Sequence, residues 1–289
     1  MKKNNLLIWA GALLLNSSCV LAEAPINLDV ELAASKDDNL NRSALANDEI
    51  ESTFYTATSG LGFTHRINPL SFVNYSGRIK YENYVDTDGL NNAEAKFSVS
   101  YRNKPIAGFN KPTIVLDAHV AITDFETDVR DRTEYGFGVM MSAWVTDRLS
   151  ARVGTSARLR DSDSRVFDTK DVRLFFNSDL VLTRKLTTYL TFSYIRGGVV
   201  STTGDTSSVE TLHLIRIADD IEPDATFSDS ELSYRFNATT RVLNGGFNYQ
   251  MTRRQALDLS FRTVHSKEGG GVDYDSSFIN LSYMLRFKL

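Results

Sequence analysis

The sequence predicts an all-β fold, a closed antiparallel transmembrane β-barrel of about 12 strands that follows a cleavable signal peptide. Three features support this prediction. The chain begins with an export signal, its remaining length alternates apolar and polar residues in long segments, and the links between these segments are short and long in turn. We therefore divide the chain into a signal peptide, residues 1–22, and one barrel domain, residues 23–289.

The N-terminus has the three parts of a secretory signal peptide. Lysines follow the initial methionine, an apolar run covers residues 6–15, and a polar stretch covers residues 16–18. Val20 and Ala22 then occupy the small-residue positions that direct cleavage before Glu23. The apolar run is too short to cross a bilayer as a helix, which needs about 20 residues. We expect this segment to be removed after export.

The single cysteine, Cys19, falls inside the predicted signal peptide. Its removal leaves a chain without thiols, which excludes disulfides, thiolate metal sites and cysteine nucleophiles. The alternative is that Cys19 becomes a lipidated N-terminus. The preceding residues 16–18 are Asn-Ser-Ser, and they lack the apolar residue that a lipoprotein signal usually carries three positions before its cysteine.

Beyond the signal peptide, the chain repeats a period-two pattern that is typical of strands with two different faces. Residues 73–82, for example, place Val, Tyr, Gly, Ile and Tyr on one face and Asn, Ser, Arg, Lys and Glu on the other. Strands of soluble proteins average about 5–6 residues, whereas a membrane-crossing strand needs about 9–11. Twelve long segments fit the second class: 26–35, 52–65, 71–84, 92–102, 113–124, 133–146, 149–160, 171–183, 187–199, 232–251, 256–265 and 277–289.

The links between these segments alternate in length and in charge. The short links carry mostly basic residues and cover 66–70, 103–112, 146–148, 183–185 and 252–255. The long links are rich in Asp and Glu and cover 36–51, 85–91, 125–132, 161–170, 200–231 and 266–276. Outer-membrane barrels of Gram-negative bacteria have short periplasmic turns, long outer loops and an even number of strands. We therefore expect an outer-membrane protein with both chain ends on the short-turn side.

The last segment, residues 278–289, places apolar residues at every odd position up to Leu289. This resembles the C-terminal strand by which the assembly machinery recognises bacterial barrels. That signal usually ends in an aromatic residue, whereas here Phe287 lies two positions before the end. The resemblance implies the barrel-assembly machinery as a partner, together with outer-membrane lipid and lipopolysaccharide.

The two faces of the predicted strands differ sharply in chemistry. In a membrane barrel the apolar face contacts lipid and the polar face lines the lumen. We expect an outward set that includes Val73, Ile79, Tyr81, Phe97, Leu116, Phe137, Leu174, Phe192, Phe247, Leu259 and Leu281. Tyrosines near strand ends are expected to form the aromatic girdles at the interface, namely Tyr84, Tyr101 and Tyr135.

The inward face is strongly charged. Its basic members are Arg78, Lys80, Lys96, Arg152, Arg158, Arg160, Arg173, Arg262, Arg286 and Lys288. Its acidic members are Asp29, Glu31, Glu82, Glu94, Asp117, Glu134, Asp179 and Asp258. A soluble core could hold so many ionisable groups only if all were paired, whereas a watery lumen accepts them. This favours the barrel over the alternative fold, a soluble periplasmic β-sandwich.

The tenth segment contains a switch in the alternation. Apolar residues are even-numbered up to Val242 and odd-numbered from Phe247, with Gly245 and Gly246 between them. A switch at paired glycines predicts a β-bulge. The alternative is that residues 232–242 are an extension of the preceding loop.

The first functional hypothesis is a narrow pore or export channel for an anionic solute, such as an acidic saccharide. Twelve strands tilted by about 40° imply a backbone radius of about 12 Å. The arginines 152, 158, 160 and 173 lie on neighbouring segments, and guanidinium groups bind carboxylates and phosphates in bidentate fashion. The alternative is that these arginines pair with Glu94, Glu134 and Asp179 across strands and close the lumen. We predict an anion-binding lumen at Arg78, Lys80, Lys96, Arg152, Arg158, Arg160, Arg173, Arg262 and Arg286.

A resemblance bears on this hypothesis. Residues 28–42, in which an alternating strand runs into an Asp-Asp-Asn turn, resemble the first strand of certain proteobacterial outer-membrane barrels. Some of these barrels are associated with exopolysaccharide export and others with surface-lipoprotein export. The resemblance implies transport across the outer membrane. Because no helical-repeat domain is predicted, export of a polymer would need a separate periplasmic partner.

The second hypothesis, a lipid hydrolase, finds little support. His265 and Ser266 form the one candidate dyad, but neighbours on a strand point to opposite faces and cannot exchange a proton. His119 lies two residues from Asp117, a spacing that is common by chance. We predict no catalytic residue, no metal site and no cofactor, and nothing in the sequence indicates nucleic-acid binding. The acidic stretches at 86–88 and 161–163 lack the rest of a calcium loop.

The third hypothesis is a structural or adhesion barrel that works through its outer loops. The link 200–231 is the longest and contains an apolar stretch over residues 212–217. Long loops are often functional. This one is expected either to fold inward as a plug or to face outward as a contact surface.

Overall fold

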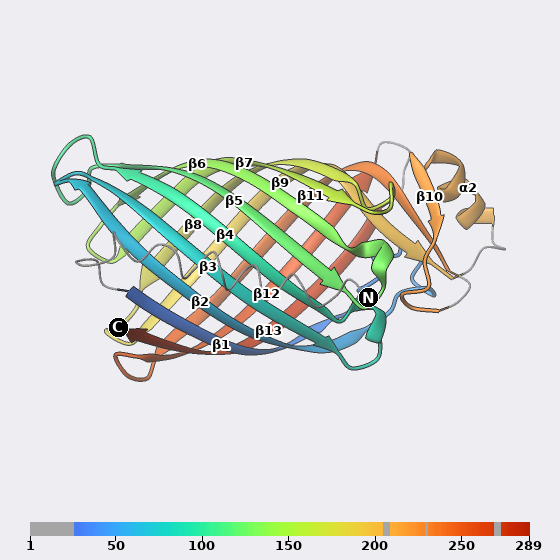
Figure 1. Cartoon of the computed structure of the whole chain (residues 1–289), viewed down its shortest axis with the longest axis horizontal. Helices are drawn as coiled ribbons and strands as arrows, with labels where there is room; N and C mark the ends of the chain where they lie inside the picture. Colours follow the sequence, from blue (N-terminus) through green and yellow to red (C-terminus); the bar gives the residue numbers. More distant parts are fainter. Residues whose placement is uncertain (1–25, 205–208, 229–230, 269–272) are drawn as a thin grey trace, which may run out of the picture.

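The computed structural model describes residues 26–204, 209–228, 231–268 and 273–289. The predicted signal peptide, with Cys19 and its cleavage site, lies outside the described residues. The described chain is almost entirely β-strand, and Figure 1 shows the strands winding obliquely around one long axis.

Twelve strands form the barrel wall. They are β1 (Ile26–Asp37), β2 (Ser52–Asn68), β3 (Ser71–Tyr84), β4 (Asn92–Asn103), β5 (Thr113–Phe125), β6 (Arg132–Trp144), β7 (Leu149–Ser162), β8 (Thr169–Val181), β9 (Leu186–Thr203), β11 (Leu232–Gln250), β12 (Gln255–Glu268) and β13 (Asp273–Lys288). Each pairs antiparallel with its neighbour in sequence, and β1 also pairs with β13. Because β9 pairs with β11, the sheet closes on itself. The predicted 12-stranded closed barrel is confirmed.

Among the described residues of the links, there are three helices and one short strand. The 3₁₀ turns η1 (Asp88–Leu90) and η2 (Asp128–Arg130) follow β3 and β5, and α2 (Val209–Ile217) with β10 (Asp220–Pro223) lies between β9 and β11. The strand β10 extends the sheet by pairing with the first residues of β11. In the part of the chain that the structure describes, no helix is long and apolar enough to cross a membrane.

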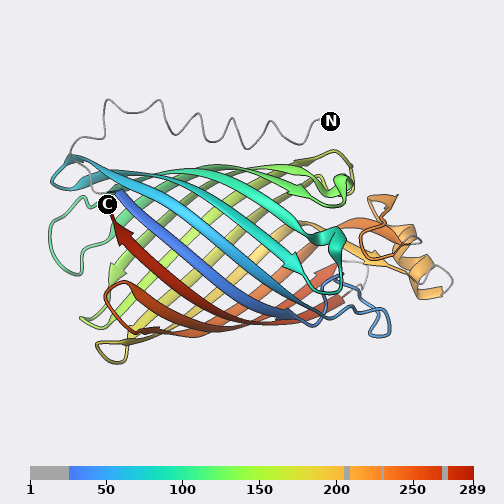
Figure 2. The same cartoon turned by 60° about the horizontal axis from the view of Figure 1, so that its bottom comes forward.

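The two ends of the barrel differ as predicted. Five links gather at one end, the short-turn end, where the chain also ends and Leu289 donates a backbone hydrogen bond to Ile26. Four of these links have two to four residues, and the fifth, residues 104–112, has nine. The other six links gather at the opposite end, the long-loop end, where Figure 2 shows α2 and β10 projecting beyond the wall; all of these except the one between β12 and β13 have six residues or more. An even strand number returns both ends of the wall to the same side, which is why β1 starts beside the end of β13.

The apolar side chains point out of the barrel, as the alternation predicted. Phe137, Leu174 and Leu259 are each at least half exposed, with 57%, 56% and 50% of their surface accessible. Such a belt of exposed large apolar side chains is unfavourable in water and favourable against acyl chains. The inward positions of the same strands carry the charged residues, so the soluble sandwich is excluded.

The prediction of a β-bulge in the tenth segment, which is β11 in the structure, is wrong. The register of β11 is continuous against both β9 and β12, and the one irregular pairing of β2 and β3 lies between Arg66 and Asn68. The switch has another cause. Toward the long-loop end, Tyr234 and Phe236 turn inward and are nearly fully buried, while Arg235 and Arg241 point outward. The strand has left the apolar belt there, so its outer face meets water and its inner face packs under the loops.

The predicted position of one girdle residue, Tyr84, is also wrong. Tyr84 faces the interior, where its ring stacks on Phe54 with centroids 4.6 Å apart, and Phe54 in turn contacts Phe278 at 5.9 Å. Tyr135, in contrast, points outward and is 51% exposed. Tyr84 occupies an even position on β3 and so shares the inward parity of Arg78, which its place at the strand end does not reveal.

Candidate functional site

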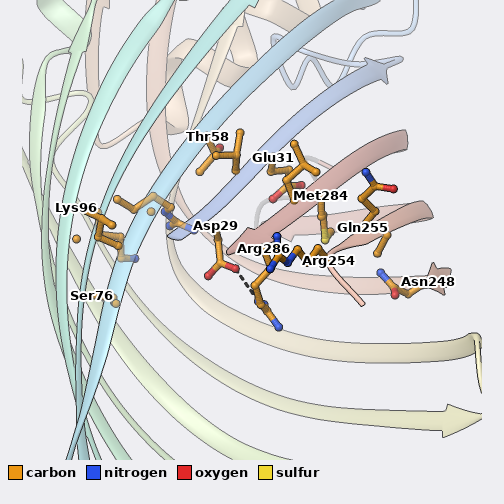
Figure 3. A pocket seen from close by; sticks show the side chains of 18 of the residues that line it. Asp29, Glu31, Thr58, Ser76, Lys96, Asn248, Arg254, Gln255, Met284 and Arg286 are labelled. Carbon is orange, nitrogen blue, oxygen red and sulfur yellow. Dashed lines mark hydrogen bonds and ion pairs between the residues drawn. The ribbon is translucent and has the colours of Figure 1, made fainter. Parts of the chain in front are cut away.

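The lumen contains two cavities along the barrel axis. The first cavity, of about 620 Å³, lies in the short-turn half and is lined from β1 to β4 and from β11 to β13. Figure 3 shows Asp29, Lys96, Asn248 and Arg286 around it. The second cavity, of about 530 Å³, lies in the long-loop half between β7, β8, β9 and the strands β11 to β13.

Both cavities have a basic excess, although the whole chain has a formal net charge of −4. The first cavity is lined by two acidic residues, Asp29 and Glu31, and by five basic ones: Arg78, Lys96, Arg253, Arg254 and Arg286. The second is also lined by two acidic residues, Asp37 and Asp171, and by five arginines: Arg42, Arg158, Arg160, Arg173 and Arg262. The acidic residues that outweigh this excess lie mostly in the long links.

The structure divides the predicted anion-binding residues among three places. Arg158, Arg160, Arg173 and Arg262 line the second cavity. Arg78, Lys96 and Arg286 line the first cavity. Lys80 and Arg152 line neither, since each lies against a carboxylate on the wall. The expected ladder of four arginines on β7 and β8 is therefore a group of three, with Arg152 apart near the short-turn end.

A charged network crosses the wall from β5 to β8. Arg160 donates to Glu134 at 2.8 Å and contacts Asp171 at 3.4 Å, and Arg158 donates to Asp171 at 3.1 Å. His119 lies 3.0 Å from the other oxygen of Glu134. The strand register explains the network, because Glu134 faces Arg160 directly on β6 and β7, and Arg158 faces Asp171 on β7 and β8.

Ion pairs with carboxylates hold six of the nine predicted residues, five of them across neighbouring strands and one, Lys80 with Glu82, within β3. Besides Arg158 and Arg160, the pairs are Arg78–Glu94 at 3.9 Å, Lys80–Glu82 at 3.0 Å, Arg152–Asp179 at 2.5 Å and Arg286–Asp29 at 2.7 Å. Of the four arginines expected to pair with Glu94, Glu134 and Asp179, Arg160 pairs with Glu134 and Arg152 with Asp179, whereas Arg158 pairs with Asp171 and Glu94 pairs with Arg78. These pairs do not fill the lumen, because both cavities remain beside them.

Three predicted residues have no carboxylate partner among the described residues: Lys96, Arg173 and Arg262. Arg173 donates to Ser193 at 2.7 and 3.0 Å and lies 5.1 Å from the centre of the Phe175 ring. Arg262 lies 4.7 Å from the centre of the Phe278 ring. Neutral partners leave these guanidinium charges available to an anion in the lumen.

Sequence reasoning missed three basic lining residues. Arg253 and Arg254 belong to the turn between β11 and β12 and reach into the first cavity. Arg42, in the link between β1 and β2, adopts a left-handed backbone with φ of 53° and reaches into the second cavity. Non-glycine residues seldom adopt this conformation. A charged residue in an irregular link carries no periodicity, so no sequence signal could have placed it.

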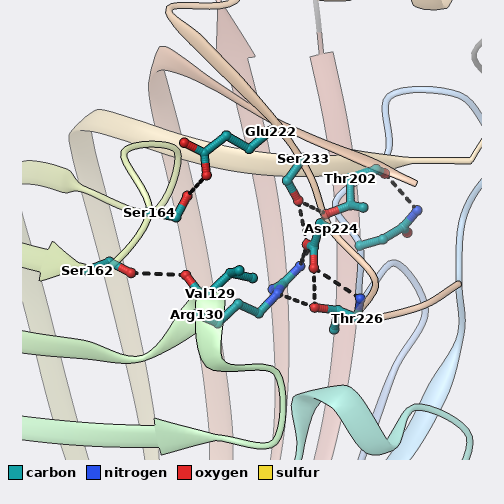
Figure 4. Close-up of polar contacts among 10 residues, drawn as sticks. Val129, Arg130, Ser162, Ser164, Thr202, Glu222, Asp224, Thr226 and Ser233 are labelled. Atoms are coloured by element: carbon teal, nitrogen blue, oxygen red, sulfur yellow. Dashed lines mark hydrogen bonds and ion pairs between the residues drawn. The ribbon is translucent and has the colours of Figure 1, made fainter. Parts of the chain in front are cut away.

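The long-loop end is crossed by a segment of the link between β9 and β11. We call residues 222–226 the strap. In it, Asp224 is buried, lies 2.5 Å from Arg130 of η2, and accepts a hydrogen bond from Ser233 of β11 at 2.6 Å (Figure 4). Arg130 also donates to Thr226 at 2.7 Å. Burial raises the pKa of Asp224, but the Arg130 guanidinium and the surrounding hydrogen bonds outweigh it, so the pKa lies below its ordinary value.

The strap joins opposite sides of the barrel. A methyl group added at Gly89, between β3 and β4, would lie 2.6 Å from the carbonyl oxygen of Thr226. Ser233 belongs to β11, which lies five strands away around the ring. Glu222, at the start of the strap, accepts a hydrogen bond from Ser164 in the link between β7 and β8. The strap therefore spans the mouth, which favours the plug over the outward contact surface for this part of the link.

His265 and Ser266, the candidate dyad, do not contact each other. His265 is exposed and lies 2.7 Å from Asp275, whereas Ser266 is fully buried on the other face and shares a hydrogen bond of 2.7 Å with Thr240. The two candidate residues thus point in opposite directions, as expected from their positions on one strand. Across the residues that the structure describes, no three His, Cys, Asp or Glu side chains gather as a metal site.

No protein family and no characterised protein matches the sequence. Solved structures do match the fold. An outer membrane channel from Pseudomonas putida F1 superimposes with a TM-score of 0.58 at 10% identity, covering 91% of this chain and 96% of that one. The NanC porin has a TM-score of 0.46 at 8% identity over 89% of this chain and 98% of that one. The first likeness shows that this chain has the fold of an outer-membrane β-barrel.

Proposed function

We propose that this protein is a narrow outer-membrane channel for anionic solutes, delivered to the membrane by the predicted signal peptide. The single observation that carries the proposal is the basic excess of both luminal cavities in a chain whose net charge is negative. Lys96, Arg173 and Arg262 are the residues most able to interact with a passing anion, because no described carboxylate neutralises them. Low-dielectric walls strengthen such a field inside a narrow passage.

An acidic saccharide is the finer proposal for the solute. The first cavity supports it, since the neutral polar groups Thr58, Ser76, Ser98, Asn248 and Gln250 lie among its basic residues. Hydroxyl and amide groups pair with sugar hydroxyls, while the arginines pair with a uronate carboxylate. Partners follow from the location: outer-membrane lipid and lipopolysaccharide, the barrel-assembly machinery and, for a polymer, a periplasmic export protein.

A second candidate is a non-conducting structural or adhesion barrel. The strap favours it, because the ion pair of Arg130 with the buried Asp224 fastens a segment across the mouth. The two candidates differ in one respect that can be measured. A channel admits solutes through the lumen with the strap in place or displaced, whereas a structural barrel admits none.

The experiment is liposome swelling with purified, refolded protein. We expect faster entry of glucuronate than of glucosamine, which has a similar size and the opposite charge. The double variant R173Q/R262Q removes the two unneutralised luminal arginines and should reduce the preference. The matched control R196Q/R241Q removes two arginines that point outward from β9 and β11 and should leave it unchanged. Equal entry of both sugars, or no entry of either even when Arg130→Gln releases the strap, would refute the anion channel.

A further inference from the structure

The second cavity has an apolar wall that a porin lumen does not require. Inward-facing Ile195 and Val199 of β9, Val242 of β11, Val264 of β12 and Phe278 of β13 all line it. They lie on adjacent strands, since β9, β11, β12 and β13 are consecutive in the ring. Lumen-facing positions of an aqueous barrel are generally polar. A continuous apolar surface beside a basic cavity therefore indicates a ligand with an apolar part.

The part of the same cavity that adjoins this apolar wall is cationic. Arg158, Arg160 and Arg173 reach it from β7 and β8, and Arg173 faces Ile195 directly in the register of β8 and β9. Arg262 lies over the ring of Phe278, where a guanidinium meets an aromatic face. Charge and apolar surface thus meet at two points, Arg173 with Ile195 and Arg262 with Phe278.

Of the five hydroxyl side chains that line this cavity, four have protein partners, and the fifth belongs to Tyr274. Ser193 accepts from Arg173 at 2.7 Å, Ser276 donates to Asp37 at 2.8 Å, and Thr191 accepts from Asn177 at 2.9 Å. The hydroxyls of Thr240 and Ser266 share a hydrogen bond. The side-chain amide oxygen of Asn244 has no hydrogen-bond partner, so it can accept a hydrogen bond from one donor group on a ligand. A saccharide with several hydroxyls would leave most of them without partners against Val242 and Val264, and each unpaired buried hydroxyl weakens binding.

We infer that the second cavity binds an amphiphilic anion, a single carboxylate, sulfonate or phosphate group carried on a compact apolar ring or short chain. The anionic group would contact Arg173 and Arg262, and the apolar body would lie against Ile195, Val242 and Val264. The volume of about 530 Å³ suits a small ligand of this class. The inference rests on the proposed anion channel. It states that amphiphilic anions bind in the second cavity of that channel, whereas hydrophilic anions pass through the cavity without binding.

The test is isothermal titration calorimetry of the detergent-folded full barrel with two carboxylates of matched shape. Cyclohexanecarboxylate and glucuronate share a six-membered ring and one charge and differ in their hydroxyl groups. We expect cyclohexanecarboxylate to bind at least about tenfold more tightly, because glucuronate would leave hydroxyls unpaired. The isosteric double variant V242T/V264T should remove most of this preference. R173Q/R262Q should weaken cyclohexanecarboxylate binding by about tenfold. Because partition of the ligand into the micelle does not depend on these two arginines, the same variant also controls for it.

Each outcome decides the inference. The comparison is made on the part of the binding that R173Q/R262Q weakens, because these two arginines line the second cavity and not the first. For that part, equal binding of the two carboxylates, tighter binding of glucuronate, no binding of either, or a preference that V242T/V264T leaves intact would overturn the inference. A difference in electrophoretic mobility between heated and unheated samples confirms that each variant is folded. The proposed channel is judged separately by its anion preference in liposomes, so a channel that prefers anions but binds no cyclohexanecarboxylate keeps the function and loses this inference.

Discussion

The guanidinium of Arg130 lies 2.5 Å from the carboxylate of Asp224 at the mouth of the barrel, where Asp224 is buried and the Arg130 side chain is 15% exposed. The two residues are 94 positions apart in sequence, one in η2 and the other in the strap. Asp224 has no accessible side-chain surface, so either charge alone would be strongly destabilised. The pair therefore fastens the strap to the wall.

Loss of one partner should release the strap. Arg130→Gln leaves a buried carboxylate without its cation, which typically costs about 3–5 kcal/mol. We expect faster proteolytic cleavage within residues 209–228 and a higher single-channel conductance, with the barrel itself still heat-modifiable. The double variant R130M/D224L removes both charges and should restore slow cleavage. An unchanged cleavage rate and conductance in Arg130→Gln would show that the pair does not hold the strap.

Closure of the strap should depend on pH through Glu231. Burial, together with the nearby charges of Asp224 and Asp48, raises the pKa of Glu231 from 4.5 to about 7, against a lowering contribution from Ser228 and Arg130. A raised carboxyl pKa means that the closed form prefers the protonated group. The stabilisation is complete below about pH 4.5 and is lost as the pH rises toward about 7.

Conductance measured between pH 5 and pH 8 should therefore rise with pH. Glu231→Gln mimics the protonated group and should flatten most of this rise. Asp131, beside the strap's partner Arg130, has a pKa that burial raises to about 6, so Asp131→Asn should remove the remainder. If the conductance of Glu231→Gln rose with pH as much as that of the wild type, a group other than Glu231 would be responsible for the pH dependence.

The charged network of β5 to β8 should tune selectivity. Asp171 is 6% exposed and neutralises both Arg158 and Arg160. Asp171→Asn removes a negative charge from the second cavity, so the ratio of chloride to potassium permeability should increase. It also weakens two charge-assisted hydrogen bonds, at about 1.5–3 kcal/mol for a bond of this kind. Reversal potentials and urea unfolding test both effects, and a decreased chloride preference contradicts the assignment.

A glycine makes room for the network. A methyl group at Gly136 would overlap the ring of His119, so Gly136→Ala must displace the histidine from Glu134. Overpacking of this kind costs about 1–3 kcal/mol, which should lower the urea midpoint of unfolding. Gly60→Ala is the matched control, because its nearest contact would be 3.6 Å away. Equal midpoints for the two variants would mean that His119 moves freely.

Alternation was sufficient to predict the barrel wall. The charged and apolar faces of β3 assign Arg78 to the lumen and Ile79 to the exterior, and the structure has both there. The cross-strand partners of Arg78 and Arg152 could also be foreseen, because oppositely charged residues occupy inward positions on neighbouring strands. These features depend on a period of two residues, which the sequence displays directly.

The features beyond the apolar belt could not be predicted in this way. At Tyr234 the alternation continues, but the apolar side chain turns inward because the outer face has reached water. The sequence shows the parity switch without showing where the membrane ends. Arg42, Arg130 and Asp224 lie in irregular links, where contacts depend on how distant loops meet rather than on a period. The strap and part of the second cavity are built from such residues.

The most direct test of the anion channel is the reversal potential of the wild-type protein in a planar bilayer under a potassium chloride gradient. The basic excess of both cavities predicts a chloride-selective potential, reduced in R173Q/R262Q and unchanged in R196Q/R241Q. A potassium-selective potential, or a membrane that stays non-conducting even when Arg130→Gln has released the strap, would contradict the account.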